Sequence, residues 1–133
     1  MEPELLIQKA LEARQRAYAP YSQFKVGAAL LTASGKVFTG CNIENSSFGL
    51  TICAERTALF KAISEGYSPT EQPFLAMAVV ADGKEPVTPC GACRQVLMEC
   101  CSSSTRLYLA NLEGRWVEKT VGELLPFPFG WQK

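Results

Sequence analysis

The stretches Cys53-Ala54-Glu55-Arg56-Thr57-Ala58 and Pro89-Cys90-Gly91-Ala92-Cys93-Arg94-Gln95 each place a cysteine where a helix is predicted to begin. After the first stretch, strong helix formers continue to Glu65 and stop before a glycine. Between the two stretches lies an almost wholly apolar run, Phe74 to Ala81, which is typical of a central strand covered on both faces. The second helix is predicted over residues 91–100. A helix, a buried strand and a second helix in this order indicate an α/β fold.

The remaining elements extend this centre in both directions. Towards the N-terminus we predict an amphipathic helix from Leu5 to Ala17 and a β-hairpin of strands 25–31 and 36–42, followed by a loop up to Ile52. Towards the C-terminus we predict strands at 106–110 and 115–119 and a short helix at 121–125. This order predicts a single domain over residues 1–133, with three α/β/α layers and a mixed sheet of about five strands.

Composition excludes several classes of protein. Thirteen basic side chains balance thirteen acidic ones, so no summed positive charge is available to hold a nucleic acid backbone. No apolar run approaches the roughly 20 residues that cross a bilayer, and residues 1–18 lack the apolar core of a signal peptide. We therefore expect a cytoplasmic protein that binds neither nucleic acid nor membrane, and whose six cysteines stay reduced.

Cysteine supplies the candidate metal ligands. The chain contains no histidine, which removes every imidazole ligand and the Ser-His and Cys-His nucleophile pairs. Cys53 and the pair Cys90-x-x-Cys93 offer three sulfur ligands for a tetrahedral zinc, and a fourth position left to water is typical of catalytic zinc sites. The alternative is a closed structural site with Cys41 or Cys100 as fourth ligand. Free thiols fit the strand and helix-end positions of Cys41 and of Cys100-Cys101 better.

A glutamate completes the pattern, because Glu55 follows Cys53 by two residues and a proline precedes the cysteine pair. A zinc ligand two residues before a glutamate, followed by Pro-Cys-x-x-Cys, is the signature of zinc deaminases, in which three cysteines can serve as ligands. On these motifs the chain resembles the small homotetrameric branch of the cytidine deaminase family. The likeness covers nearly the whole chain, with further matching segments at 20–22, 24–29, 40–45 and 123–126 and at Phe129.

The resemblance implies zinc-dependent hydrolysis of cytidine and 2′-deoxycytidine to uridine and 2′-deoxyuridine with release of ammonia, a step of pyrimidine salvage. Zinc held by Cys53, Cys90 and Cys93 would lower the pKa of a bound water to roughly 7, and the hydroxide would attack C4 of the pyrimidine. Glu55 would carry the water's proton to N3 and then to the departing amine.

The same resemblance implies roles for residues around the metal. Arg56 would hydrogen-bond the ligand sulfurs and offset the excess negative charge of three thiolates. Phe24 would pack against the pyrimidine, and the backbone around Ala54 would contact its polar edge. Asn42 and Glu44 would bind the ribose.

Two further aromatic residues are expected to act between subunits. In a homotetramer with shared active sites, Phe129 would cover the site of a neighbouring subunit, and Phe48 would lie at a subunit contact. The chain departs from the family pattern at Phe127-Pro128 and in the long stretch between Glu55 and Pro89.

Three other functions are compatible with parts of this pattern. A nucleic acid deaminase would use the same zinc chemistry but should carry basic patches, which this sequence lacks. A deaminase of a cytosine-containing antibiotic such as blasticidin would share the short length and the Cys-Ala-Glu motif, whereas segments 24–27 and 42–45 favour a nucleoside. A non-enzymatic module stabilised by zinc would fold in a metal-dependent way without turnover.

Overall fold

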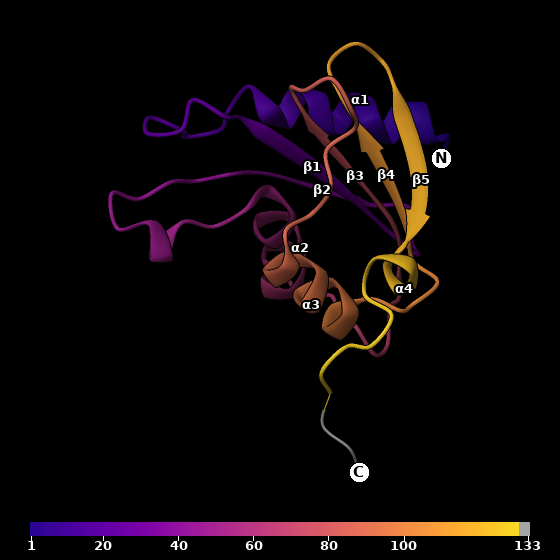
Figure 1. The fold of residues 1–133 in the computed structure, drawn as a ribbon. Helices are drawn as coiled ribbons and strands as arrows, with labels where there is room; N and C mark the ends of the chain where they lie inside the picture. Colours follow the sequence, from indigo (N-terminus) through magenta and orange to yellow (C-terminus); the bar gives the residue numbers. More distant parts are fainter. Residues whose placement is uncertain (131–133) are drawn as a thin grey trace.

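The computed structural model describes residues 1–130 and contains a mixed five-stranded sheet with the strand order β2-β1-β3-β4-β5 (Figure 1). Strand β1 pairs antiparallel with both β2 and β3, β3 pairs parallel with β4, and β4 pairs antiparallel with β5. The strands are β1 (Val26–Thr32), β2 (Val37–Cys41), β3 (Phe74–Ala81), β4 (Arg106–Ala110) and β5 (Trp116–Thr120). The predicted mixed sheet is confirmed, with boundaries within one residue of those expected.

Helices cover both faces of the sheet, which confirms the three-layer α/β/α architecture. Helix α1 (Pro3–Arg14) packs on one face, and α2 (Ala54–Ser64) and α3 (Gly91–Cys100) pack on the other, as Figure 1 shows. The short α4 (Val121–Leu124) lies beside α3. Each face has its own apolar core, one rich in alanine beneath α1 and one with larger side chains beneath α2 and α3.

Two glycines allow the helices to approach the sheet closely. A Cβ at Gly27 of β1 would lie 2.0 Å from the carbonyl oxygen of Ala10, so α1 can pack here only against a glycine. On the opposite face, a Cβ at Gly40 of β2 would lie 2.5 Å from the amide nitrogen of Ala58 and 2.7 Å from the carbonyl oxygen of Ala54. Gly40 therefore sets the height of the first turns of α2 above the sheet.

The register of the strands brings several functional segments to one edge of the sheet. The start of β1 lies opposite the end of β3, with Val26 paired to Ala81, and the end of β2 lies alongside, with Cys41 paired to Gly27. The loops that lead into α2 and α3 follow β2 and β3 from this edge. In α/β sheets the crevice outside the ends of the strands is the usual place for a ligand.

The structure differs from the sequence-based expectation at two elements. Helix α1 begins at Pro3 and ends at Arg14, not at Ala17, because proline suits the first turn of a helix and the chain must turn towards β1. The predicted loop 42–52 contains a short 3-10 helix, η1 (Phe48–Leu50). The last three residues of the predicted domain, 131–133, lie outside the described part of the chain. Within residues 1–130, every helix is too short or too polar to span a bilayer.

Candidate active site

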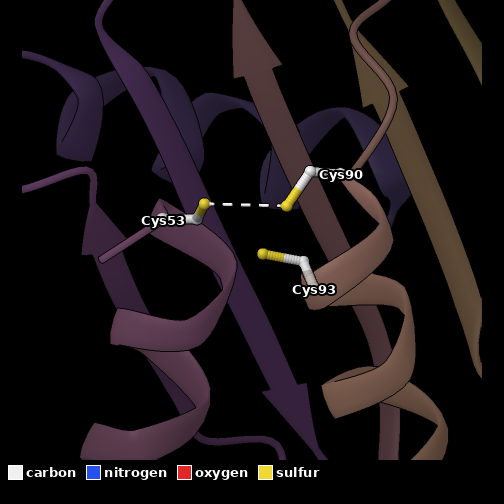
Figure 2. Close-up of side chains that lie close together, drawn as sticks. All are labelled: Cys53, Cys90 and Cys93. Carbon is white, nitrogen blue, oxygen red and sulfur yellow. Dashed lines mark hydrogen bonds between the residues drawn. The ribbon is translucent and has the colours of Figure 1, made fainter. Parts of the chain in front are cut away.

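Three cysteine sulfurs meet between the first turns of α2 and α3. Figure 2 shows the Cys53, Cys90 and Cys93 side chains pointing towards one another from these two helices. Their Sγ atoms all lie within 4.8 Å of one another, and those of Cys53 and Cys90 are 3.8 Å apart. Among the described residues this is the only such group of three or more potential ligands, and neither Cys41 nor Cys100 belongs to it.

The sulfur geometry fits a tetrahedral metal. Two sulfurs that each lie about 2.3 Å from one tetrahedral zinc are about 3.8 Å apart, the separation of the Cys53 and Cys90 sulfurs. Three sulfurs leave one coordination position for water or substrate, so this site has the ligand number of a catalytic centre and not of a closed structural one. The donor set and its spacing therefore fit zinc.

Local helix geometry explains why the sulfurs are available as ligands. Cys53 and Cys90 are the N-cap residues of α2 and α3, and Cys93 lies in the first turn of α3. Neither N-cap side chain makes a capping hydrogen bond, so its sulfur is left for another partner. The positive ends of the two helix dipoles converge at this point and stabilise thiolates.

Arg56 brings a positive charge to the same point. Its Nη2 donates to Sγ of Cys53 at 3.3 Å, and this hydrogen bond, with a further one to Cys93, raises the pKa of the guanidinium. No carboxylate within residues 1–130 forms an ion pair with Arg56, and its buried Nε has no hydrogen-bond partner there. Its hydrogen bonds therefore go to the sulfurs, and it also interacts electrostatically with the neighbouring Glu55.

The thiols of Cys53 and Cys93 share a hydrogen bond, and this shifts their pKa values in opposite directions. The hydrogen bond from Cys93, reinforced by Arg56, lowers the pKa of Cys53 to about 5. The same hydrogen bond, together with burial, raises the pKa of Cys93. This arrangement favours ionisation of Cys53, and a thiolate is the form that binds metal.

Glu55 lies beside the cysteines with its carboxyl group buried. Only 5% of the residue is exposed, and this burial raises its pKa to about 7, although a hydrogen bond from its own backbone amide acts in the opposite direction. A carboxyl group with a pKa near neutrality can both accept and donate a proton at physiological pH. A glutamate that only stabilises the N-terminus of a helix would not need to be buried in this way.

A hollow of about 190 Å³ opens over this group and contains most of the predicted substrate residues. Phe24, Asn42, Ala54 and Glu55 all line it, together with Cys53 and Cys90. Two larger hollows, of about 540 and 470 Å³, lie elsewhere and contain none of the three cysteines. The chemistry of the site, and not its volume, distinguishes the smaller hollow.

Asn42 faces the hollow while its amide is anchored to the backbone at the start of β1. Its Oδ1 accepts from the amide nitrogen of Val26 at 2.9 Å, and its Nδ2 donates to the carbonyl oxygen of Phe24 at 2.8 Å. These contacts use one donor and one acceptor position of the amide, which leaves one of each for a ligand.

The structure does not place Glu44 in the same hollow. Its carboxylate accepts hydrogen bonds from the amide nitrogens of Tyr21 and Ser22 and from the Ser22 hydroxyl. The Ser22 hydroxyl, together with the two amides, lowers the pKa of Glu44 and keeps the carboxylate charged. Glu44 lines the separate 470 Å³ hollow, with Leu50 and Phe60.

The remaining predicted residues neither belong to the metal group nor line its hollow. Phe129 is 69% exposed and does not line the 190 Å³ hollow of its own chain. Phe48 is also exposed, and its ring makes an edge contact with Tyr21. Cys100 and Cys101 pack against the larger core, where burial raises the pKa of Cys101 to about 12.

Sequence reasoning missed four residues that line the hollow. These are Val26, Thr51, Val87 and Thr88. Val26 could have been found, because it follows Phe24 by two residues and therefore shares its side of the extended chain. Val87 and Thr88 lie in a turn-rich loop, where no periodic pattern indicates which side chains point inwards.

Comparisons with known proteins agree with this geometry. Residues 1–109 match the family model described as the cytidine and deoxycytidylate deaminase zinc-binding region. The chain is 58% identical to a cytidine deaminase of Halalkalibacterium halodurans, over 97% of this chain and 95% of that protein. It is 54% identical to a cytidine deaminase of Sporosarcina psychrophila, over 97% of this chain and 92% of that one.

A solved structure shares the fold. The crystal structure of a cytidine deaminase from Burkholderia pseudomallei superposes with a TM-score of 0.93 at 53% identity, covering 97% of this chain and all of that one. The match therefore includes the elements that carry the three cysteines and Glu55. This chain belongs to the cytidine and deoxycytidylate deaminase family of zinc-binding proteins.

Proposed function

We propose that this protein is a zinc-dependent hydrolase that converts cytidine and 2′-deoxycytidine to uridine and 2′-deoxyuridine with release of ammonia. The observation that carries this function is the position of the buried Glu55, which follows Cys53 by two residues and lines the same hollow as Cys53 and Cys90 of the three-cysteine group. A structural zinc site needs neither a carboxyl group of raised pKa nor an open coordination position.

Cys53, Cys90 and Cys93 would hold the zinc ion. Bound there, zinc supplies the Lewis acidity that makes water a nucleophile near neutral pH. Three thiolates weaken that acidity because their charge exceeds that of the metal. Arg56 offsets part of this charge through its hydrogen bonds to the sulfurs.

Glu55 moves the protons of the reaction. Its carboxylate accepts a proton from the attacking water and gives it to N3 of the pyrimidine while oxygen bonds to C4. It then takes the second proton of that oxygen and gives it to the exocyclic nitrogen, so that ammonia leaves as the C4 carbonyl forms. A pKa of about 7 suits a group that must accept and donate in the same cycle.

The walls of the hollow suggest how the nucleoside is held. We assign Phe24 to one face of the pyrimidine and the backbone at Ala54 to its polar edge, because both line the hollow beside Glu55. Asn42 has one donor and one acceptor available for a ribose hydroxyl. We assign the charged Glu44 to the ribose as well. It lies in the loop after β2, where its carboxylate is hydrogen-bonded to Ser22 of the segment before β1.

We further propose a homotetramer in which subunits complete each other's sites. The hollow of one chain, about 190 Å³, is smaller than the roughly 300–1,000 Å³ of most ligand pockets. Exposed apolar side chains are available to close it from a second chain. They are Ile43, Phe48, Leu50, Phe60 and Phe129. We assign the enzyme to the cytoplasm, without a membrane partner. Its formal net charge of zero argues against a nucleic acid partner.

The test is turnover of cytidine and 2′-deoxycytidine, followed by absorbance, for the wild type and for Glu55→Gln with zinc content measured in both. Wild-type turnover and a loss of about 10²–10⁴-fold in the zinc-loaded variant are expected. Glu65→Gln, at the far end of the same helix, is the matched control and should keep full activity. A zinc-loaded wild type that converts neither nucleoside would refute the proposal, and cytosine-containing antibiotics would then be the next substrates to test.

A further inference from the structure

Two side chains that directly follow Cys93 hold the end of α4 and the C-terminal segment that follows it, residues 125–130. Arg94 donates from Nε to the carbonyl oxygen of Pro89 at 2.7 Å and from Nη1 to that of Leu124 at 3.1 Å. Gln95 donates from Nε2 to the carbonyl oxygen of Phe129 at 2.9 Å, and its Oε1 accepts from the amide nitrogen of Phe129 at 3.3 Å. One turn of α3 therefore contacts the residue directly before the C-terminal segment and a residue near the end of that segment.

The contact of Gln95 resembles strand pairing, since its side-chain amide binds both the backbone N–H and the backbone C=O of one residue, Phe129. The segment itself continues no helix or strand after α4, and its two prolines, Pro126 and Pro128, have no amide hydrogen to donate. Phe127 and Phe129 are 94% and 69% exposed. The hydrogen bonds from α3 therefore hold the backbone of a segment whose two phenylalanine side chains are largely exposed.

Arg94 acts on the metal side of the same turn. The carbonyl that it binds belongs to Pro89, directly before the ligand Cys90, while its other contact is the last residue of α4. The guanidinium therefore joins the loop that carries Cys90 to the start of the C-terminal segment. A planar group with several donors in fixed directions is suited to such a bridge.

We propose that Gln95 is a positioning residue that fixes Phe129, and that Arg94 makes the Cys90-x-x-Cys93 turn and the C-terminal segment a single rigid unit. This inference rests on the proposed function, in which Phe129 covers bound substrate. Gln95 contributes to substrate affinity and not to the proton transfers of Glu55. Arg94 contributes to retention of the metal as well.

The test for Gln95 uses Gln95→Met, which keeps the length of the side chain and removes both hydrogen bonds. Glu99→Met, at an exposed position one turn further along α3, is the matched control. For Gln95→Met we expect KM to rise about fivefold while kcat stays within about twofold, because only binding interactions are lost. Hydrogen exchange at the Phe129 amide should accelerate about tenfold in Gln95→Met and remain unchanged in the control.

The two readouts separate this inference from the proposed function. If the wild type has no turnover, the function fails, and the exchange rate at Phe129 still decides whether Gln95 holds the segment. Unchanged exchange in Gln95→Met would overturn the inference, and so would an equal fall in kcat and kcat/KM. Gln95→Glu keeps an acceptor for the Phe129 amide but loses the donor, so an intermediate KM would support the two-bond contact.

Arg94 is tested by the rate at which a chelator removes zinc. Arg94→Met should release zinc on the order of tenfold faster than the wild type, whereas Gln95→Met should release it at the wild-type rate. Arg94→Lys retains a donor for one of the two carbonyls and should give an intermediate rate. Equal release from the wild type and Arg94→Met would overturn the role of Arg94 in metal retention.

Discussion

On both faces of the sheet a helix packs against a glycine, but only one face holds the candidate active site. On each face a glycine lets a helix lie against the strands, Gly27 beneath α1 and Gly40 beneath α2. Helix α1 covers a core rich in alanine, and its N-terminal residues are Glu2 and Pro3. Helices α2 and α3 cover larger side chains, and each has a cysteine at its N-cap.

The difference shows that the site depends on where helices begin and not on how they pack. The N-termini of α2 and α3 converge at the edge where β1 begins and β2 and β3 end. There the two helix dipoles stabilise thiolates, and Arg56 in the first turn of α2 contributes a full positive charge. Helix α1 has the same kind of packing, but within residues 1–130 no other helix begins beside its N-terminus.

Alanine at the two glycines should separate these effects, and it has the largest expected consequence. Gly27→Ala forces a Cβ to within 2.0 Å of the Ala10 carbonyl oxygen, so α1 must shift at a cost of about 3 kcal/mol or more in the free energy of unfolding. Gly40→Ala should cost a similar amount and also displace the start of α2, which carries Cys53 and Glu55. Urea unfolding and zinc content per folded chain measure the two effects.

The zinc content of the two variants can be compared even if both are less stable than the wild type. At low temperature, where part of each population is folded, Gly27→Ala should keep wild-type zinc content, whereas Gly40→Ala should lose zinc to a weak chelator. Equal loss of zinc from both variants would contradict the separation of the two faces.

Much of the fold could be predicted because its signals are local. The apolar run of β3 gave the strand boundaries without error, since a strand buried on both faces needs no alternation. The early end of α1 could not be predicted, because it depends on the direction in which the chain must leave Arg14 to reach β1. The helical η1 depends similarly on contacts outside its own loop.

Some residues of the site could be predicted from the sequence and others could not. Its ligands follow from the spacing of cysteines and from helix N-termini, which are features of short stretches of sequence. Glu44 differs, because whether a loop carboxylate faces a hollow or binds Ser22 and Tyr21 depends on residues far away in the sequence. The role of Phe129 towards a neighbouring subunit stays a prediction, since it concerns contacts between chains.

Removal of zinc should lower the stability of the protein moderately and should affect the α2 and α3 face of the sheet more than the α1 face. Zinc present at about one hundred times its dissociation constant stabilises the folded state by about 2.7 kcal/mol, which chelation removes. Because Cys53, Cys90 and Cys93 belong to α2 and α3, hydrogen exchange should accelerate in the first turns of these helices. Protection of α1 should change only as far as global stability falls, and a larger selective loss in α1 would contradict the assignment of the metal to the other face.

The smallest expected effects are changes in the free energy of unfolding at two carboxylates. Glu44 is buried near the site, and Glu118 is exposed on the α1 face of the sheet. Hydrogen bonds from Ser22 and Tyr21 lower the pKa of Glu44 below its ordinary value of 4.5, so its contribution to stability is present above that pH and is lost as pH falls through the lowered pKa. Glu44→Gln should therefore be less stable than the wild type at neutral pH, and the difference should shrink on acidification to about pH 3. Glu118→Gln removes an exposed ion pair to Arg106 and should change the free energy of unfolding by less than about 0.5 kcal/mol at neutral pH. Urea midpoints measured across this pH range test both, and a Glu44→Gln difference that stays constant or grows in acid would show that its hydrogen bonds do not favour the charged form.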